Sequence, residues 1–240
     1  MASSLSKNIA LVLAGGSGER FGSPTPKQFI SMCGKPLICH CLLSLQESPL
    51  IDEIYIVAKG GTLEKTQQIA HEYQLTKVKA VITGGNTRKE SCFKGLSYLR
   101  RIKVDPDDII LICDGDRPNL PLSLIRENVE SAKTYGAAVT AITATDSIFY
   151  SEAGALVDHY VPRSMMFQAQ TPQTFRFSII YAAHKKAKAN VKYDLYTDDA
   201  SLVAALTKTK IAIVEGSKEN IKVNTPQDEA IFAQIRRNIT

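Results

Sequence analysis

A glycine-rich segment near the start of the chain has residue types that suit a polyphosphate. The apolar run 9–13 (IALVL) is typical of a short buried strand, and 14–18 (AGGSG) follows it directly. A loop with so little side-chain bulk lets backbone N–H groups approach an anion closely. Arg20 and Lys27 would add positive charge beside the phosphates. The alternative is an ordinary glycine-rich turn with solvated basic residues, but the two cations and Pro26, directly before Lys27, favour a phosphate site.

Two common phosphate-binding motifs do not match this segment. The dinucleotide-binding pattern G-x-G-x-x-G opens a helix directly after a strand. Here Gly16, Gly18 and Gly22 exceed that spacing by one residue, and Pro24 and Pro26 disfavour an immediate helix. The P-loop pattern ends in Gly-Lys-Ser/Thr, which the chain lacks. If the loop binds phosphate, it does so in a different fold.

Polar residues also follow three other predicted strands. Open parallel sheets bind ligands in the crevice beyond the carboxyl ends of their strands. The segment 84–88 (GGNTR), with Ser91 one helical turn after Arg88, follows the third predicted strand, and 114–118 (DGDRP) follows the fourth. The segment 219–222 (ENIK) comes just after the last one. We expect these segments and the glycine loop to converge on one site.

Asp114 is the strongest candidate for a metal ligand. A carboxylate at the tip of a buried strand suits Mg²⁺, which prefers one or two carboxylates plus substrate phosphates. The alternative is that Asp114 caps the following turn or pairs with Arg117. Asp116 could share the metal, but in an extended backbone its side chain would point away from that of Asp114. We expect Arg117 to be a structural partner rather than a catalyst.

The composition is that of an ordinary globular protein. With 240 residues, 44% hydrophobic and 22% charged, the chain suits one domain. Its net charge of +5 comes from scattered basic residues, which argues against nucleic-acid binding. The five cysteines lack zinc spacing, since neighbours in Cys39-His40-Cys41 do not share a helix face. We expect reduced, mostly buried thiols in a cytoplasmic protein without a signal peptide or membrane span.

Strand-like and helix-like patterns alternate, which predicts an α/β fold with a Rossmann-like, predominantly parallel sheet flanked by helices. Expected strands are 9–13, 53–58, 78–82, 108–113, 137–143 and 210–214, and expected helices are 36–46, 63–73, 88–101, 122–135, 177–189, 198–206 and a last one from 226. The alternation breaks between about 145 and 175, where 147–150 and 156–160 are short β-like pieces. We predict one domain, 1–240, with a β-arm at about 145–175, an element that proteins often use for subunit exchange.

Six segments, in order along nearly the whole chain, resemble the cytidylyltransferase family of the 2-C-methyl-D-erythritol 4-phosphate and ribitol-5-phosphate enzymes. They are LAGGSGERFG…PKQF, GGNTRKES, D-x-x-RP, QAQTPQTF, TDDAS and NIKVNTPQD. The resemblance implies a nucleotidyltransferase fold and Mg²⁺-dependent transfer of a cytidylyl group from CTP to a polyol phosphate, with release of pyrophosphate. It also implies a homodimer whose exchanged arm completes the partner's site. Family members usually have His-Asp-Ala before Arg-Pro, where this chain has 113–116 (CDGD).

The resemblance gives catalytic roles to four cations. Arg20, Lys27 and Lys222 would stabilise charge on the α-phosphate and the leaving pyrophosphate. Arg163, reaching across the dimer interface, would position the incoming polyol phosphate. The full expected set of polyol-phosphate contacts is Arg163, Thr171 and Asp198.

The resemblance also implies a metal site and a nucleotide site. Asp114 would hold Mg²⁺, and Glu219 is a candidate second ligand. Gly84, Gly85 and Arg88, with Ser91, would face the cytosine and ribose. The full expected set of CTP contacts is Leu13, Ala14, Gly15, Gly16, Ser17, Gly18, Arg20, Lys27, Gly84, Gly85, Asn86, Arg88, Ser91, Asp114 and Lys222.

Within the family, the segment 161–172 (VPRSMMFQAQTP) and the LAGG opening are more similar to the ribitol-phosphate enzymes. We therefore favour D-ribitol 5-phosphate as acceptor, giving CDP-ribitol for a wall or capsule polymer. The alternatives are 2-C-methyl-D-erythritol 4-phosphate, for isoprenoid biosynthesis, or another alditol phosphate. A sugar-1-phosphate nucleotidyltransferase fits the GGNTRKES turn poorly. A non-catalytic nucleotide-binding regulator is disfavoured because all five functional cations and carboxylates are present: Arg20, Lys27, Asp114, Arg163 and Lys222.

Overall fold

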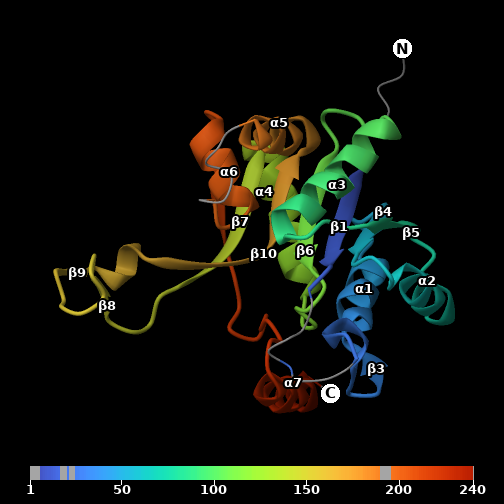
Figure 1. The fold of residues 1–240 in the computed structure, drawn as a ribbon, viewed down its shortest axis with the longest axis horizontal. Coiled ribbons are helices and arrows are strands. Elements are labelled where there is room, and N and C mark those ends of the chain that lie inside the picture. Colours follow the sequence, from blue (N-terminus) through green and yellow to red (C-terminus); the bar gives the residue numbers. More distant parts are fainter. Residues whose placement is uncertain (1–5, 17–20, 22–24, 190–195, 240) are drawn as a thin grey trace.

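Seven strands form one mixed, mostly parallel sheet, which is the centre of the molecule (Figure 1). The structure is a computed structural model, and it describes residues 6–16, 21, 25–189 and 196–239. The strand order is β11-β7-β10-β6-β1-β4-β5. Only β10 runs antiparallel to its neighbours, so the predicted parallel character is confirmed. The strands are β1 (Asn8–Ala14), β4 (Glu53–Ala58), β5 (Val78–Thr83), β6 (Ile109–Asp114), β7 (Ala137–Thr143), β10 (Phe167–Arg176) and β11 (Ala212–Glu215).

Helices cover both faces of this sheet. One face carries α1 (Leu37–Glu47), α2 (Leu63–Glu72) and α4 (Leu122–Tyr135), and the other α3 (Arg88–Arg101), α5 (Phe177–Lys188) and α6 (Asp199–Leu206). Successive side chains of a strand point to opposite faces, so Val12 of β1 packs in the first layer and Leu11 in the second. The last helix, α7 (Pro226–Ile239), packs through Phe232 on the hairpin of β2 (Ser31–Met32) and β3 (Lys35–Pro36). The βα alternation is therefore confirmed, with boundaries shifted by one or two residues.

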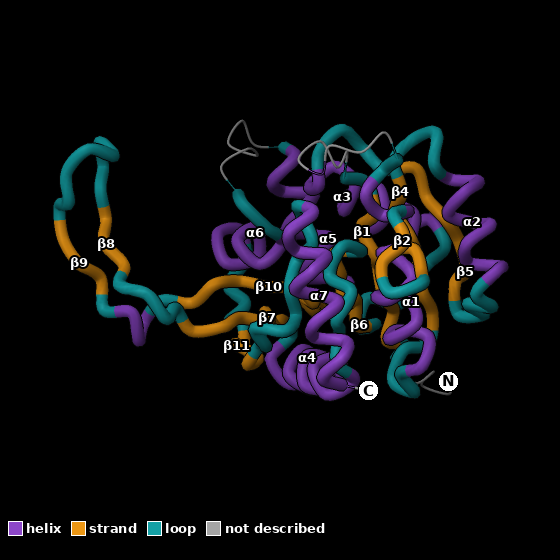
Figure 2. The backbone as a smooth tube through the Cα atoms, turned by 90° about the horizontal axis from the view of Figure 1, so that it is seen from below, coloured by secondary structure: helices purple, strands orange, loops and turns teal. Residues whose placement is uncertain are grey.

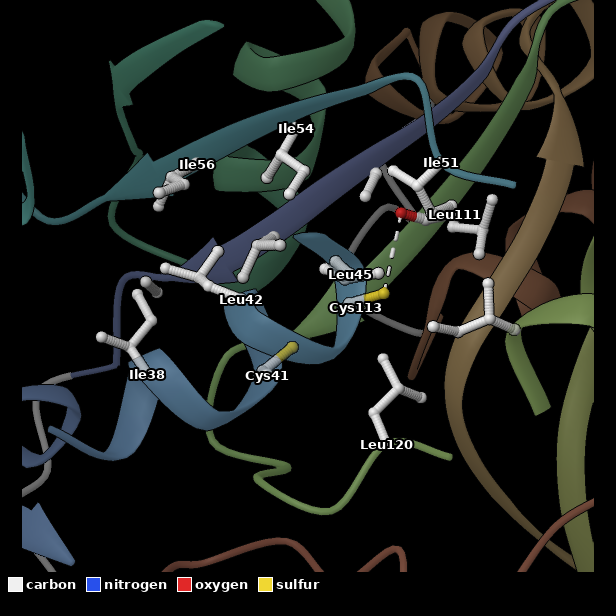
Figure 3. Packing of buried hydrophobic residues seen from close by; sticks show 14 of the residues in the cluster. Ile38, Cys41, Leu42, Leu45, Ile51, Ile54, Ile56, Leu111, Cys113 and Leu120 are labelled. Atoms are coloured by element: carbon white, nitrogen blue, oxygen red, sulfur yellow. Dashed lines mark hydrogen bonds between the residues drawn. The ribbon is translucent and has the colours of Figure 1, made fainter. Parts of the chain in front are cut away.

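Two cysteines lie in the apolar cluster between α1 and the sheet (Figure 3). Cys41 of α1 and Cys113 of β6 are buried among aliphatic side chains, Leu42 and Leu111 among them. Burial raises the pKa of the Cys41 thiol to about 12, so this thiol is neutral at physiological pH. All five cysteines are free, and all but Cys33 are buried, which confirms the expected structural burial.

The arm is shorter than the sequence predicts. The strands β8 (Ile148–Tyr150) and β9 (His159–Val161) form a hairpin that projects from the body in both views (Figures 1 and 2). Residues 167–175, expected in the arm, instead belong to β10, which pairs with β7 from Phe167 and also with β6 from Gln173 onward. Most of the buried residues of β10 are the polar segment 170–174 (QTPQT). The strand therefore lacks the apolar run by which a central strand is predicted from sequence. Across the described part of the chain, no helix is long and apolar enough to span a bilayer.

Candidate active site

The carboxyl ends of β1, β4, β5 and β6 surround a cavity of about 760 Å³. This edge is where open parallel sheets bind ligands, and the volume is typical of a small-molecule site. The loops after these four strands and the loop after β11 all contribute to the wall. The lining residues are Leu13, Gly15, Gly16, Lys59, Gly60, Thr83, Gly84, Gly85, Asn86, Thr87, Arg88, Ser91, Asp114, Asp116 and Lys222.

The cavity brings together most of the residues predicted to contact CTP. Ala14, the buried last residue of β1, is not part of its lining. Ser17, Gly18 and Arg20 lie outside the described residues. Lys59 and Gly60 are lining residues that we did not predict, although they directly follow β4 and the same strand-end rule would have found them.

The turn between β5 and α3 forms one wall and is supported by side chains of α3. The Gly85 N–H donates to Ser91 Oγ at 3.0 Å, and Lys94 Nζ donates to the Gly84 carbonyl at 2.8 Å. A Cβ atom at Gly84 would lie 2.8 Å from Ser91 Oγ, so a side chain here would displace the hydroxyl group that holds Gly85. The turn is therefore held in place before any ligand binds, and its contact with cytosine or ribose stays a prediction.

Asp114, the last residue of β6, is the centre of a cluster of charges. Arg88 Nε lies 3.1 Å from its Oδ1, and Lys222 Nζ and Arg117 Nε lie 2.8 and 4.0 Å from its Oδ2. Burial raises the pKa of the Asp114 carboxyl, but Arg88 and Lys222 outweigh burial and hold the pKa below its ordinary value. Asp114 is therefore ionised at neutral pH, as a metal ligand must be.

Asp116 lies on the same side as Asp114, because the backbone does not stay extended, the condition under which we expected its side chain to point away. Strand β6 ends at Asp114 and residues 115–116 form a turn, so the alternation of an extended strand no longer applies. Lys222 Nζ is 3.9 Å from Asp116 Oδ1 and 2.8 Å from Asp114 Oδ2. Both carboxylates therefore face the same ammonium group.

Lys27 does not line the cavity but is buried against Asp116. It begins the 3-10 turn η2 (Lys27–Phe29). Its Nζ donates to Asp116 Oδ2 at 2.7 Å, to Asn224 Oδ1 at 3.2 Å and to the Val223 carbonyl. The Lys27 ammonium thus compensates the charge of Asp116, and a direct contact with a triphosphate stays a prediction.

Asp114 and Asp116 together supply the oxygen donors that a divalent cation such as Mg²⁺ prefers. Asp116 Oδ1 is buried and has no hydrogen-bond partner within the described ranges. The Lys222 ammonium beside both carboxylates shows that this position accepts positive charge. The residues present therefore fit a divalent cation. Glu219, predicted as the second ligand, is exposed and does not line the cavity, so Asp116 is the better candidate.

The loop that places Lys222 is anchored by Asn220, which is fully buried. Asn220 Nδ2 donates to the Thr171 carbonyl at 2.9 Å and to Gln170 Oε1 at 3.2 Å. The Asn220 carbonyl accepts from Arg117 Nη1 at 2.6 Å. Strand β10 and Arg117 thereby fix the loop, which gives Arg117 the structural role that we expected.

The three residues predicted to bind a polyol phosphate do not come together in one chain. Thr171 of β10 is buried, and its Oγ1 accepts from the Asp114 N–H at 3.1 Å. Asp198 caps α6 and accepts from Gln173 Nε2 at 2.7 Å, so its carboxylate is already engaged. Arg163 is exposed in the 3-10 turn η3 (Arg163–Met165) of the arm and does not line the cavity.

Asp199, the neighbour of Asp198, reaches the site although we did not predict it. It is fully buried, with Oδ2 at 2.6 Å from Arg88 Nη1 and Oδ1 at 2.9 Å from His184 Nε2. Cys92 belongs to the same cluster, in which one ligand atom from each of Cys92, His184 and Asp199 lies within 4.8 Å of the others. These residues come from α3, α5 and α6, so no local spacing rule could have linked them.

Replacing Asp199 with asparagine is expected to lower the free energy of unfolding by about 2 kcal/mol at pH 7, because hydrogen bonds to a charged group are lost. Burial raises the pKa of the Asp199 carboxyl, but Arg88 and His184 outweigh burial, so the folded-state pKa lies below its ordinary value. The charge therefore stabilises the fold fully above a pH of about 4, the unfolded pKa, and less as the pH falls toward the depressed value. Urea unfolding at pH 7 and pH 3 checks this. A difference between wild type and variant that grows at pH 3 would contradict the assignment.

Residues 8–237 match the family described as 2-C-methyl-D-erythritol 4-phosphate cytidylyltransferase, abbreviated IspD. The chain belongs to this family. It is therefore a cytidylyltransferase, as the order of its motifs predicts. The Asp114 cluster at the sheet edge is accordingly the candidate active site of an IspD-family enzyme.

Relatives within the IspD family include both acceptor types. A 2-C-methyl-D-erythritol 4-phosphate cytidylyltransferase of Geotalea uraniireducens is 39% identical over 220 residues, 91% of this chain and 92% of that protein. A ribitol-5-phosphate cytidylyltransferase of Streptococcus agalactiae is 34% identical over 226 residues, 94% of this chain and 93% of that protein. The methylerythritol-phosphate enzyme is thus the more similar of these two relatives. The preference for ribitol 5-phosphate that we inferred from the segment 161–172 is not supported.

A solved structure confirms the expected fold. The crystal structure of 4-diphosphocytidyl-2C-methyl-D-erythritol synthase from Anaerococcus prevotii aligns with a TM-score of 0.84 at 26% identity. The alignment covers 97% of this chain and 96% of that chain. The seven-stranded sheet with its flanking helices is thus the architecture of IspD-family proteins.

Proposed function

We propose that this cytidylyltransferase transfers the cytidylyl group of CTP to 2-C-methyl-D-erythritol 4-phosphate. An oxygen of the acceptor phosphate forms a bond to the α-phosphorus of CTP, the bond from that phosphorus to the bridging oxygen breaks, and pyrophosphate leaves. The observation that carries the proposal is the family match over residues 8–237. The 39% identity to the Geotalea enzyme supports the choice of acceptor.

The charge cluster suits this reaction. The attacking phosphate is already anionic, so the enzyme has to position the reactants in line and neutralise phosphate oxygens rather than remove a proton. Lys222 and Arg88 line the cavity beside Asp114 and supply preorganised positive charge for the α-phosphate region. The turn at Gly84 and Gly85 forms the adjoining wall, where we place the cytosine and ribose.

Asp114 and Asp116 would hold Mg²⁺, which when bound supplies further positive charge to the phosphate oxygens. Lys222, which these carboxylates engage in this structure, would then be free to contact the phosphates. Lys27 lies against Asp116, so its charge acts on the same region. We keep the glycine loop, with Ser17, Gly18 and Arg20, as the expected cradle of the triphosphate.

We further propose that two copies of the chain assemble through the arm. The arm exposes large apolar and aromatic side chains, which mark interaction surfaces when they gather: Phe149, Tyr150, Leu156, Val157, Tyr160 and Met165. Arg163 lies on the same arm, outside the cavity of its own chain. A partner's arm would therefore bring Arg163 to the acceptor phosphate. Thr171 would act within its own chain, where its Oγ1 accepts a hydrogen bond from the Asp114 N–H and so holds the Asp114 backbone.

Ribitol 5-phosphate is the second candidate acceptor. The 34% identity to the Streptococcus enzyme and the segment 161–172 favour it. Pyrophosphate release with CTP and Mg²⁺ separates the two acceptors when each is supplied in turn. We expect kcat/KM for 2-C-methyl-D-erythritol 4-phosphate to exceed that for ribitol 5-phosphate by at least about 10-fold, a difference of about 1.4 kcal/mol. A preference for ribitol 5-phosphate would reverse the assignment, and CTP binding without turnover on either would argue for a non-catalytic regulator.

A further inference from the structure

A chain of hydrogen-bonded side chains runs from the helix layer into the active site. His184 Nε2 is 2.9 Å from Asp199 Oδ1, and Asp199 Oδ2 is 2.6 Å from Arg88 Nη1. Arg88 Nε is in turn 3.1 Å from Asp114 Oδ1, and Asp114 Oδ2 is 2.8 Å from Lys222 Nζ. His184 and Asp199 are completely buried, so they touch no solvent or substrate. Among the described residues, this buried end is linked to Asp114 through Arg88.

The buried end is rigidly held by its surroundings. The ring of Phe93, from α3, stacks on the His184 ring with centroids 6.1 Å apart. The start of α6 is fixed by Gln173 of β10, whose Oε1 accepts from the Ala200 N–H at 2.9 Å and whose Nε2 donates to Asp198 at 2.7 Å. These contacts fix the start of α6, which carries Asp199, and the His184 ring to which Asp199 is hydrogen-bonded.

The three residues Cys92, His184 and Asp199 also have ligand types that suit zinc, but their geometry is that of an ion-pair network. His184 and Asp199 are directly hydrogen-bonded, and Arg88 takes the other oxygen of Asp199. A cation would have to displace the Arg88 guanidinium. The cluster is therefore explained by its bonds to Arg88.

We propose that Asp199 and His184 are positioning residues of the cytidylyltransferase site, which orient Arg88 and, through it, the Asp114 carboxylate. The proposal rests on the function proposed above for Arg88 and Asp114. Arginine has a flexible side chain, and ordering it costs conformational entropy. Asp199 binds Nη1 of Arg88 and so orders this side chain before the substrate binds. The Arg88 Nε then stays directed toward Asp114. Groups that orient a metal-ligating residue typically contribute about 10–100-fold to metal affinity or activity.

Two pairs of variants test the proposal. Asp199→Asn is matched by Asp108→Asn, because Asp108 is also a buried aspartate that accepts backbone hydrogen bonds but precedes β6 at the end opposite Asp114. His184→Leu removes the hydrogen bond to Asp199. In His184→Gln, the side-chain amide N–H can still donate to Asp199 Oδ1. Dissociation constants are measured for Mn²⁺ by electron paramagnetic resonance with CTP present, and for CTP by calorimetry. Thermal unfolding is followed for each protein.

We expect Asp199→Asn and His184→Leu to weaken Mn²⁺ and CTP binding by about 10-fold or more. Asp108→Asn and His184→Gln should stay within about 3-fold of wild type, which corresponds to less than about 0.7 kcal/mol. Wild-type affinity in His184→Leu, or an equal loss in Asp108→Asn, would overturn the positioning role. Should Asp199→Asn fail to fold, the two His184 variants decide the question. Failure of the wild type to bind CTP would instead overturn the proposed function, and this inference with it.

Discussion

Lys222→Ala is expected to lower kcat by about 10²–10³-fold, the usual loss when one preorganised group for transition-state charge is removed. Lys222 lines the cavity, and its ammonium lies 2.8 Å from the Asp114 carboxylate. Its side chain is 34% exposed, so its loss leaves no large cavity in the core. Asp114 keeps Arg88 as a partner, and we therefore expect the fold to persist.

Pyrophosphate release at saturating CTP and Mg²⁺ measures this effect. Lys218→Ala is the matched control, because it removes an exposed lysine of the same loop that does not line the cavity. Circular dichroism and thermal unfolding establish that both variants are folded. Nearly full turnover in Lys222→Ala would exclude Lys222 from stabilisation of charge on the α-phosphate of CTP.

Asp114→Asn is expected to have a larger effect, a loss of kcat on the order of 10³-fold. A bound cation supplies several kcal/mol of charge stabilisation, and each 1.36 kcal/mol is worth a factor of ten. Asparagine keeps the size and a carbonyl oxygen of the side chain but removes the negative charge that pairs with Arg88 and Lys222 and would hold a divalent cation. The affinity for Mn²⁺ should fall with the rate.

The dependence of turnover on Mg²⁺ concentration checks the assignment. In Asp114→Asn the concentration for half-maximal rate should rise strongly, whereas Asp108→Asn, just before the opposite end of β6, should keep the wild-type value. A variant that retains wild-type rate and Mg²⁺ dependence would remove Asp114 from the metal site.

The sheet edge that carries the site could be predicted because its information is local. Each buried strand is an apolar run, and a ligand site in a parallel sheet lies where such strands end. Gly84 and Asp114 could be placed at the cavity in this way, and both line it. Lys59, which obeys the same rule, was missed only because its segment has no conspicuous motif.

The remaining features depend on contacts between distant segments. The direction of the Asp116 side chain follows from the exact end of β6, which a sequence pattern fixes only to within a residue or two. Asp199 meets Arg88 across 111 positions of sequence, because α5 packs against both α3 and α6. Strand β10 is central and yet polar, because Gln173 and Thr174 bond to neighbouring elements rather than fill an apolar layer.

Both legs of the arm continue neighbouring strands of the body. The chain leaves the sheet from β7 and returns into β10, and these strands pair with each other at the base, where Phe167 stands opposite Thr143. The arm is thus built as an outgrowth of a two-stranded ladder, not as a loop inserted at a turn. Adding one residue to a single leg would move its side chains to the opposite face, so the reach of the arm can change only by matched additions to both legs. In the proposed dimer, the distance that one subunit's arm could reach toward its partner would therefore change only in discrete steps.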